Sequence, residues 1–268
     1  RTDYVSQYWS LTARAQNYQI LQDPAAATDP SLTVIRPYDR LPQINFHAGR
    51  YDVAGFDWAL DAELVRFSHP DFQTGNRAVA IPQISYPFIR PGYFVTPKLM
   101  VHSSKYDVDT VGGASRTLTR TLPTFSLDSG LIYERDARLL GKNVTQTLEP
   151  RLFYVYTPYK DQSMFPLFDT AEAGFNFAQI FSENRFIGAD RVADANQVTA
   201  AVTSRFIEEN GAERLRLAIG QRFYFRDQRV LLDPSQTRTD QRSDLLVAAS
   251  GRIDDDWSFD SAVQYDAS

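Results

Sequence analysis

Residues 56–64 read Phe-Asp-Trp-Ala-Leu-Asp-Ala-Glu-Leu, in which apolar and polar side chains alternate with Ala59 as the only interruption. Successive side chains of a β-strand point to opposite faces, so a period of two is the sequence pattern of a half-apolar strand. One face of this strand carries Phe56, Trp58, Leu60, Ala62 and Leu64, and the other carries Asp57, Asp61 and Glu63. The stretch therefore predicts a strand with one apolar face and one charged face.

The same period recurs along the whole chain, and we predict about eleven strands from it. Many of them are near the length that a tilted membrane strand requires. In residues 214–225, for example, Arg214, Arg216 and Arg222 all avoid the apolar face. The predicted strands include or begin near Trp9, Ile44, Phe56, Tyr93, Phe125, Val144, Val198, Leu215, Leu245 and Trp257, and a weaker alternation lies near Ile84.

The connections between these strands are predicted to alternate between short and long. Short links are expected near residues 53–55, 90–92, 138–142, 210–211 and 254–256. Long links are expected over residues 21–40, 69–77, 106–120, 157–196 and 227–241. Outer-membrane barrels have this asymmetry, with tight turns at one end and long loops at the other. Asn210-Gly211 also suits a type I′ hairpin turn, because both residues tolerate a positive φ.

Composition limits the class of protein. No apolar run approaches the roughly eighteen residues of a membrane-spanning helix, and the mean hydropathy is −0.37. These two values argue against a membrane-spanning helix but not against a transmembrane β-barrel, because only alternate residues of a barrel strand face lipid. A net charge of −5 argues against a nucleic-acid surface. The absence of cysteine excludes disulfides and thiolate chemistry within these residues.

These patterns predict an all-β protein, an antiparallel up-and-down transmembrane β-barrel. The alternative is a soluble β-sandwich or propeller, whose strands also alternate between apolar and polar residues. Tyrosines near strand ends favour the membrane barrel, which places aromatic girdles at both interfaces. These tyrosines are Tyr93, Tyr133, Tyr154, Tyr156 and Tyr265.

Three unusual segments carry a family resemblance. They are residues 36–46 (RPYDRLPQINF), residues 146–151 (QTLEPR) with the tyrosine-rich stretch that follows, and residues 188–199 (GADRVADANQVT). In this order they are similar to the central part of the C-terminal outer-membrane barrel domain of the LptD family of LPS-assembly proteins. The resemblance covers most of the chain and implies a single barrel domain over residues 1–268, incomplete at both ends.

The resemblance also implies a function and partners. A family member is expected in the bacterial outer membrane, where it translocates lipopolysaccharide into the outer leaflet. An LptE-like lipoprotein is expected in the barrel lumen. Periplasmic components of the lipopolysaccharide bridge are expected to dock on an N-terminal domain that this chain lacks.

The chain departs from the complete family pattern. It lacks the family's cysteines and has no final aromatic strand before Ser268. About eleven strands are too few to close so large a barrel. We therefore expect a central fragment of the barrel.

Polar residues on the charged strand faces and in the longest loop are the predicted contacts of the lumen or of a partner. Charge is costly against lipid but is solvated or paired inside a barrel. An Asp-Arg pair followed by amides in residues 190–197 is expected to fold inward onto the plug or the strand walls; a salt bridge within the loop is the alternative. The candidates are Glu149, Arg151, Asp190, Arg191, Asn196, Gln197 and Arg205.

The same loop contains an apolar stretch, which would be poorly placed in water. Phe175, Phe177, Ile180 and Phe181 lie within seven residues of one another. We predict that this stretch folds back over the lumen.

Two other functions share the strand pattern, namely a passive porin and an outer-membrane hydrolase. Only His47, His69 and His102 are present, and His102 and Ser103 lie on opposite faces of a strand, so they form no simple dyad. We predict no enzyme activity, no metal and no cofactor. A partner that fills the lumen would distinguish the transport barrel from a porin.

Overall fold

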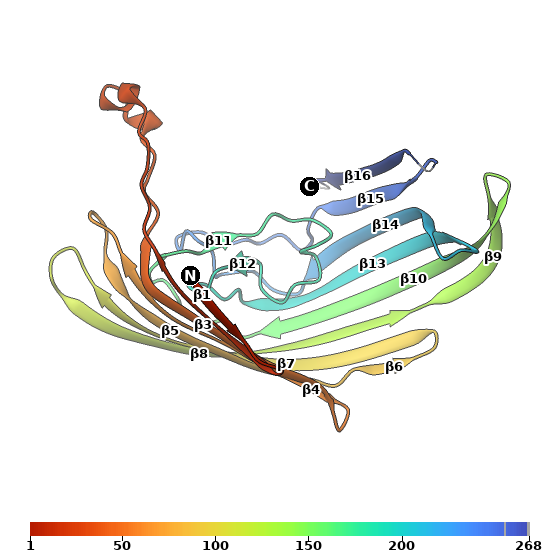
Figure 1. The fold of residues 1–268 in the computed structure, drawn as a ribbon, viewed down its shortest axis with the longest axis horizontal. Helices are drawn as coiled ribbons and strands as arrows, with labels where there is room; N and C mark the ends of the chain where they lie inside the picture. The colour runs from red at the N-terminus through yellow and green to blue at the C-terminus, as the bar shows by residue number, and fades with distance from the viewer. Residues whose placement is uncertain (255, 267–268) are drawn as a thin grey trace.

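The computed structural model describes residues 1–254 and 256–266, which form sixteen strands and two short 3₁₀ helices (Pro24–Ala27 and Pro30–Leu32). Figure 1 shows the strands curled into a trough, with the N- and C-terminal strands at opposite sides. The strands are β1 (Thr2–Val5), β2 (Trp9–Gln16), β3 (Asp39–Val53), β4 (Phe56–Ser68), β5 (Thr74–Ser85), β6 (Phe88–Arg90), β7 (Tyr93–Asp109), β8 (Ser115–Leu131), β9 (Tyr133–Leu139), β10 (Lys142–Thr157), β11 (Ala171–Glu172), β12 (Phe186–Ile187), β13 (Ala195–Glu208), β14 (Glu213–Tyr224), β15 (Leu245–Arg252) and β16 (Ser258–Tyr265).

The strands pair in sequence order, so the topology is up-and-down. The main sheet has fourteen strands, in the order β1-β2-β3-β4-β5-β7-β8-β10-β13-β14-β15-β16, with β6 paired to β7 and β9 paired to β10. Every pair is antiparallel, and the described sheet is open at β1 and β16. The predicted all-β antiparallel architecture is therefore confirmed. Each of the eleven predicted strands is present, whereas the short strands β1, β6, β9, β11 and β12 were missed.

The convex face of the sheet is lined by exposed apolar side chains that lie side by side. One cross-strand row consists of Trp58, Ile84, Leu99, Phe125 and Tyr156. A second row consists of Val202, Ile219, Val247 and Val263. All nine side chains are between 37% and 57% exposed, which is unusual for contiguous large apolar residues in a protein surrounded by water.

The two ends of the trough differ in the length of their connections. At one end the links are short, over residues 6–8, 54–55, 91–92, 140–141 and 209–212; the predicted link at 254–256 includes Asp255, which lies outside the described residues. The opposite end carries long links over residues 17–38, 158–194 and 225–244. Two predicted long links are wrong, because only residues 69–73 and 110–114 lie outside the strands.

The polar composition of residues 115–120 hides the continuing strand. Arg116, Leu118 and Arg120 point into the trough while the residues between them point outward. The alternation of inward and outward side chains therefore continues through residues 115–120, although two of the inward side chains are arginines and the outward ones are polar.

The turn at Asn210-Gly211 also differs from the prediction. Gly211 has a φ of 83°, but Asn210 does not have a positive φ, so the turn is not type I′. The amide of Gly211 donates to the carbonyl of Glu208, and the amide of Glu208 donates to the carbonyl of Ala212. This is a type I turn followed by a glycine bulge, which takes up an extra residue in the hairpin. Ala54-Gly55 and Leu140-Gly141 instead have two positive φ angles each.

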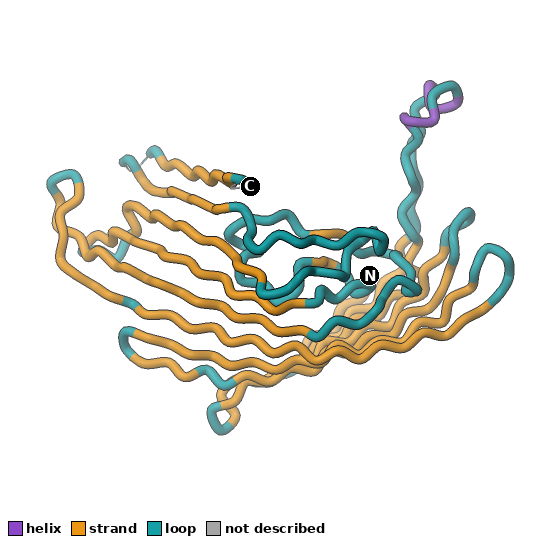
Figure 2. The backbone as a smooth tube through the Cα atoms, turned by 180° about the vertical axis from the view of Figure 1, so that it is seen from behind, coloured by secondary structure: helices purple, strands orange, loops and turns teal. Residues whose placement is uncertain are grey.

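The longest link, residues 158–194, lies inside the trough rather than beyond its end (Figures 1 and 2). We call this segment the inward loop; it contains the two-stranded sheet of β11 and β12. The loop between β2 and β3 instead projects away from the sheet as an extended arm with the 3₁₀ helices at its tip. Among the described residues, no helix has the length and apolar character needed to cross a membrane.

Gly75 allows β5, β7 and the inward loop to approach one another closely. A Cβ atom at this position would lie 2.6 Å from the carbonyl oxygen of Asp107 and 3.3 Å from the ring of Phe168. We expect Gly75→Ala to lower the free energy of unfolding by about 1–3 kcal/mol, because overlap with backbone forces the strands apart.

The matched control is Gly112→Ala, whose Cβ atom would meet nothing within 4 Å. Thermal unfolding of the full-length protein, followed by circular dichroism, measures both variants. Equal stability of the two variants would show that the strands adjust without loss.

Candidate functional site

The inward loop is held on the concave face first by apolar contacts. Phe165 and Phe168 from the loop are buried in one cluster with Val65, Phe67 and Tyr106 from the sheet. Phe168 stacks on Phe67 with ring centroids 4.5 Å apart. Burying two phenyl side chains in this way contributes roughly 2–3 kcal/mol each. The cluster brings the first third of the loop against β4 and β7.

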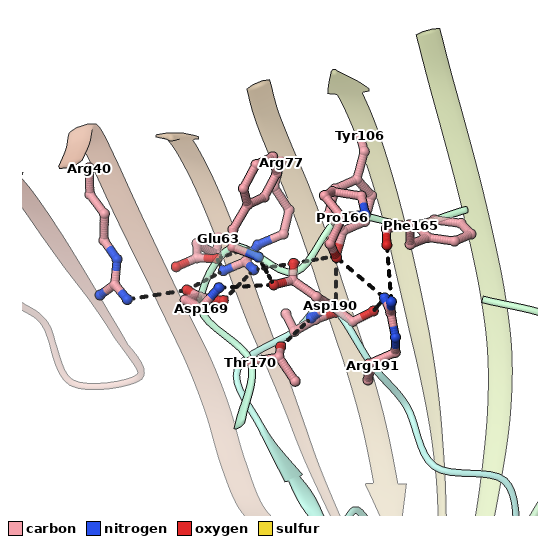
Figure 3. A network of polar contacts seen from close by, with 12 residues as sticks. Arg40, Glu63, Arg77, Tyr106, Phe165, Pro166, Asp169, Thr170, Asp190 and Arg191 are labelled. Carbon is pink, nitrogen blue, oxygen red and sulfur yellow. Dashed lines mark hydrogen bonds and ion pairs between the residues drawn. The ribbon is translucent and has the colours of Figure 1, made fainter. Parts of the chain in front are cut away.

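Arg77 of β5 is the centre of a buried charge network beside this cluster (Figure 3). Its side chain is only 2% exposed and meets three carboxylates. Nη1 lies 2.6 Å from Oδ1 of Asp169 and 2.7 Å from Oδ1 of Asp190, while Nη2 lies 2.5 Å from Oε2 of Glu63. Arg40 adds a second ion pair to Asp169 at 3.4 Å. Two acids of the loop are thus tied to two strands of the sheet.

Asp190 is completely buried, and both of its carboxylate oxygens are satisfied. Oδ1 accepts hydrogen bonds from Arg77 and from the Tyr106 hydroxyl at 3.1 Å. Oδ2 accepts from the backbone amides of Phe168 at 2.7 Å and Asp169 at 3.0 Å. One oxygen therefore faces the sheet and the other fixes the backbone of the loop. A charge-assisted network of this kind holds its partners in one geometry.

Arg120 of β8 adds a second guanidinium, which binds backbone carbonyl oxygens of the inward loop. It donates to the carbonyl oxygens of Ala189 at 2.7 Å and Asp190 at 2.8 Å, and to Oε1 of Gln162 at 2.5 Å. His102 lies 3.1 Å from the same guanidinium. Arg77 and Arg120 together therefore hold both the side chain and the carbonyl of Asp190.

Arg191 shapes the loop from within. Its guanidinium donates to the carbonyl oxygens of Phe165, Pro166 and Asp190 at 3.1–3.3 Å. Burial lowers the pKa of the Arg191 guanidinium, and the neighbouring Asp190 carboxylate opposes that shift. Arg191 thus stabilises the turn of the loop, whereas Asp190 ties the loop to the wall.

The middle of the inward loop is anchored on the other side of the trough. The carbonyl oxygen of Ile180 accepts from the Thr199 hydroxyl at 2.9 Å and from Arg222 at 2.7 Å. The Arg151 guanidinium lies over the Phe181 ring at 3.9 Å. Ile180 is fully buried, and Phe181 packs against Phe153. This apolar stretch, which was predicted to fold back over the lumen, thus lies against the concave face of the open sheet.

The end of the inward loop is joined to the loop over residues 225–244. Both carboxylate oxygens of buried Asp194 accept from the backbone amide of Arg229, and Oδ1 also accepts from that of Val230. Arg185 donates to the side-chain oxygen of Gln228 and to the carbonyl of Val230. Burial lowers the pKa of the Arg185 guanidinium, against the opposing effect of Glu172.

The seven candidate residues fall into three places. Asp190 and Arg191 lie in the network around Arg77, although they form no ion pair with each other. Glu149, Arg151, Gln197 and Arg205 lie on the concave face, where Arg151 pairs with Asp128 at 2.6 Å and Arg205 pairs with Glu149 at 3.1 Å. Asn196 lies on the convex side, where it accepts from the Tyr154 hydroxyl at 2.9 Å. Its expected position inside the trough is therefore wrong, because the strand alternation places Gln197 there instead.

Sequence reasoning missed Arg77, Arg120, Tyr106, Asp169 and Gln162. A signal was present for Arg77, since it alternates with Gly75 and Val79 and so shares their inner face. Nothing in the sequence identifies its partner Asp169, which lies ninety-two residues further along the chain.

The three histidines lie apart in structural positions. His47 is exposed and lies 2.7 Å from Asp61, His69 accepts from the backbone amides of Asp71 and Phe72, and His102 is buried beside Arg120. Within residues 1–254 and 256–266, no group of three or more His, Cys, Asp or Glu side chains is arranged to hold a metal ion.

Comparison with known proteins identifies one family over the full length. The family model described as "LptD: LPS transport system D" matches residues 1–268. An LPS-assembly protein LptD from Aromatoleum aromaticum is 49% identical, over 99% of this chain and 33% of the relative. The protein of the same name from Azoarcus sp. strain BH72 is 48% identical, over 97% of this chain and 32% of the relative. The protein of the same name from Bordetella parapertussis is 44% identical, over 99% of this chain and 35% of the relative. The chain spans about a third of the length of these relatives.

Removing Arg77 should release the inward loop. In Arg77→Ala the carboxylates of Asp169 and Asp190 lose their buried cation, which typically costs about 3–5 kcal/mol. We expect faster trypsin cleavage after Lys160, Arg185 and Arg191 in the full-length protein, measured by mass spectrometry. Arg66→Ala is the control, because Arg66 is exposed on the other face of the sheet. A cleavage rate equal to that of the control would mean that the apolar contacts alone hold the loop.

Proposed function

The chain belongs to the LptD family, and from this we propose that it forms part of the wall of an outer-membrane barrel that assembles lipopolysaccharide into the outer leaflet. Residues 1–268 are then one stretch of a larger barrel domain. The observation that carries the proposal is a two-faced antiparallel sheet in a chain that matches the family model throughout. The proposal requires no catalytic nucleophile, because transport of this kind breaks no covalent bond.

The convex face supports contact with lipid. The two cross-strand rows through Leu99 and Val247 cover much of the sheet with large apolar side chains, and neither row contains a charge. An apolar outer band is the requirement for a barrel in a bilayer. By the same reasoning, the end with short links faces the periplasm and the end with long links faces the cell surface.

The concave face supports passage of a polar substrate. It carries Glu63, Arg77, Asp128, Arg151, Arg205 and Arg216, whose charges would be expensive in lipid. The sugars and phosphates of lipopolysaccharide need such a surface, whereas its acyl chains do not. The two faces thus match the two halves of the proposed substrate.

We further propose that a lipoprotein of the LptE type occupies the lumen beside the inward loop. The loop presents a surface fixed on both sides of the trough, by Arg77 near one end and by Arg222 near its middle. A rigid surface loses little conformational entropy when a partner binds. Bridge components of the periplasm would bind parts of the protein outside residues 1–268. A passive porin is the competing function, and it requires no partner.

The full-length protein should retain its partner only while the inward loop is in place. We expect Asp190→Ala to reduce the amount of lipoprotein that co-purifies from outer membranes at least severalfold, because four hydrogen bonds to the loop and wall are lost. Surface lipopolysaccharide should fall in parallel when the variant replaces the resident protein.

The matched control is Asp227→Ala, an exposed aspartate in the neighbouring loop. A full-length wild-type protein that conducts small solutes and co-purifies with no lipoprotein would contradict the proposal and support the porin.

The lipid contact of the convex face is tested at Leu99. Its cross-strand neighbours are Ile84 and Phe125, and its side chain is 47% exposed. An arginine on the lipid face costs about 2–4 kcal/mol near the bilayer midplane. We therefore expect Leu99→Arg to reduce the amount of folded protein in the outer membrane, measured by heat-modifiable migration in gels.

Met100→Arg is the control, because the adjacent side chain points into the trough beside Lys98. Equal loss in both variants would indicate that the convex face does not contact lipid.

A further inference from the structure

A second polar site lies in the trough, away from the Arg77 network and nearer the end with short links. It is a cavity of about 660 Å³ over β10, β13, β14, β15 and β16. Phe177 and Phe181 of the inward loop bound it on one side, and the inner face of the sheet forms its floor. We call it the alanine cavity, after the residues that line its floor.

The floor is flat because small side chains follow one another across the strands. Thr203, Ala218, Ala248 and Ala262 are direct cross-strand neighbours on the inner face. Side chains this short leave open the space that larger residues fill elsewhere in the trough. The floor and the two phenyl rings therefore make an apolar slot.

A row of polar residues borders this slot on the side of the short links. It consists of Arg205, Arg216, Ser250 and Asp260, again as direct cross-strand neighbours. Arg205 and Arg216 stand opposite each other, and two like charges in that position destabilise a sheet unless an opposite charge lies between them.

The partners of the two arginines are unequal. Arg205 pairs with Glu149 at 3.1 Å and, through its buried Nε, with Glu213 at 3.7 Å. Throughout the described part of the chain, Arg216 has neither a hydrogen bond nor an ion pair. Asp260 is two strands from Arg216, or about 10 Å at the backbone, and forms no ion pair with it.

The hydroxyls around this pair have no partner among the described residues either. Ser250 lies directly opposite Arg216 in the ladder, and Thr203 lies one row away, opposite Ala218. Both residues line the cavity. The Arg216 guanidinium and the two hydroxyls thus supply a set of hydrogen-bond donors at one end of an apolar slot, beside the positive charge of Arg205. Guanidinium groups bind phosphate and carboxylate with paired, charge-assisted hydrogen bonds.

We propose that the alanine cavity binds an anionic sugar of the substrate, with its phosphate or carboxylate between Arg205 and Arg216 and its ring against the alanines and phenyl rings. This inference rests on the proposed function, because lipopolysaccharide supplies the sugar. Asp260 confines the anion to the arginine side of the row and accepts from sugar hydroxyls on the other. The neutral floor lets the sugar leave again, as transport requires.

The test measures binding to the full-length protein with its lipoprotein, in nanodiscs, by surface plasmon resonance. The probes are intact lipopolysaccharide, its enzymatically dephosphorylated form and its carboxyl-reduced form. Arg216→Gln should weaken binding of intact lipopolysaccharide about tenfold, the effect of losing a charge-assisted hydrogen bond, and Arg216→Lys should weaken it less. Ala248→Leu, which fills the slot and removes no charge, should also weaken it.

The control variants are Arg66→Gln, which removes an arginine from the convex face, and Val247→Leu, which enlarges a side chain there. Both should bind lipopolysaccharide like the wild type. The modified probe whose binding no longer responds to Arg216→Gln identifies the anion as phosphate or carboxylate.

The outcomes separate this inference from the proposed function. If wild-type protein binds no form of lipopolysaccharide, both fail. If it binds but Arg216→Gln and Ala248→Leu match their controls, the cavity is not a substrate site while the transport function stands. If the two variants instead release the lipoprotein and leave lipopolysaccharide binding unchanged, the cavity holds a protein segment and the proposal is overturned.

Discussion

The ion pairs of Arg77 determine where the longest loop of this protein lies. A guanidinium on β5 that is 2% exposed has no access to water and must be neutralised by neighbouring groups. Glu63 on the next strand supplies one carboxylate, and Asp169 and Asp190 bring two more from residues that follow β10. If the loop left the trough, Arg77 would keep only Glu63 of its three carboxylate partners. The loop and the inner wall are therefore stable only together.

This coupling gives the trough two ends with different character. Near the long links, phenylalanines and buried charges fill the space between loop and sheet, and there is little room for a substrate. Toward the short links, the floor changes to alanine, and Arg216 has no hydrogen bond or ion pair within the described chain. The first region is built for rigidity and the second for exchange. The stable anchor at one end holds Phe177 and Phe181 where they bound the open cavity at the other.

The sequence predicts the strands well because their alternation is a local property. Every strand of eight or more residues was found, and β1 was missed because its 4 residues are too few to show a period. The loop predicted over residues 106–120 is too long for a related reason: Arg116 and Arg120 point inward, so a polar stretch there is still a strand. Asn196 was misplaced because a shift of one residue reverses the face.

The site itself was predictable only in part. Asp190 was singled out from its motif, but its partner Arg77 comes from a strand one hundred and thirteen residues away. Only the strand order and register, which place the inward loop against β4 and β5, bring these residues together.

The proposed substrate places opposing demands on the inner wall. Phosphates and acidic sugars need cations in the path, but a cation that binds too tightly would stop transport. Arg77 avoids this because its donors are already used by carboxylates of the wall and the loop, and Arg120 because both of its Nη atoms donate to carbonyl oxygens of the loop. Arg151 is likewise occupied by Asp128 and by the ring of Phe181. Arg216 alone in this group has no partner in the described chain, and it stands directly opposite Arg205 in the ladder. A single weak anion site beside a neutral floor is the arrangement that permits both binding and release.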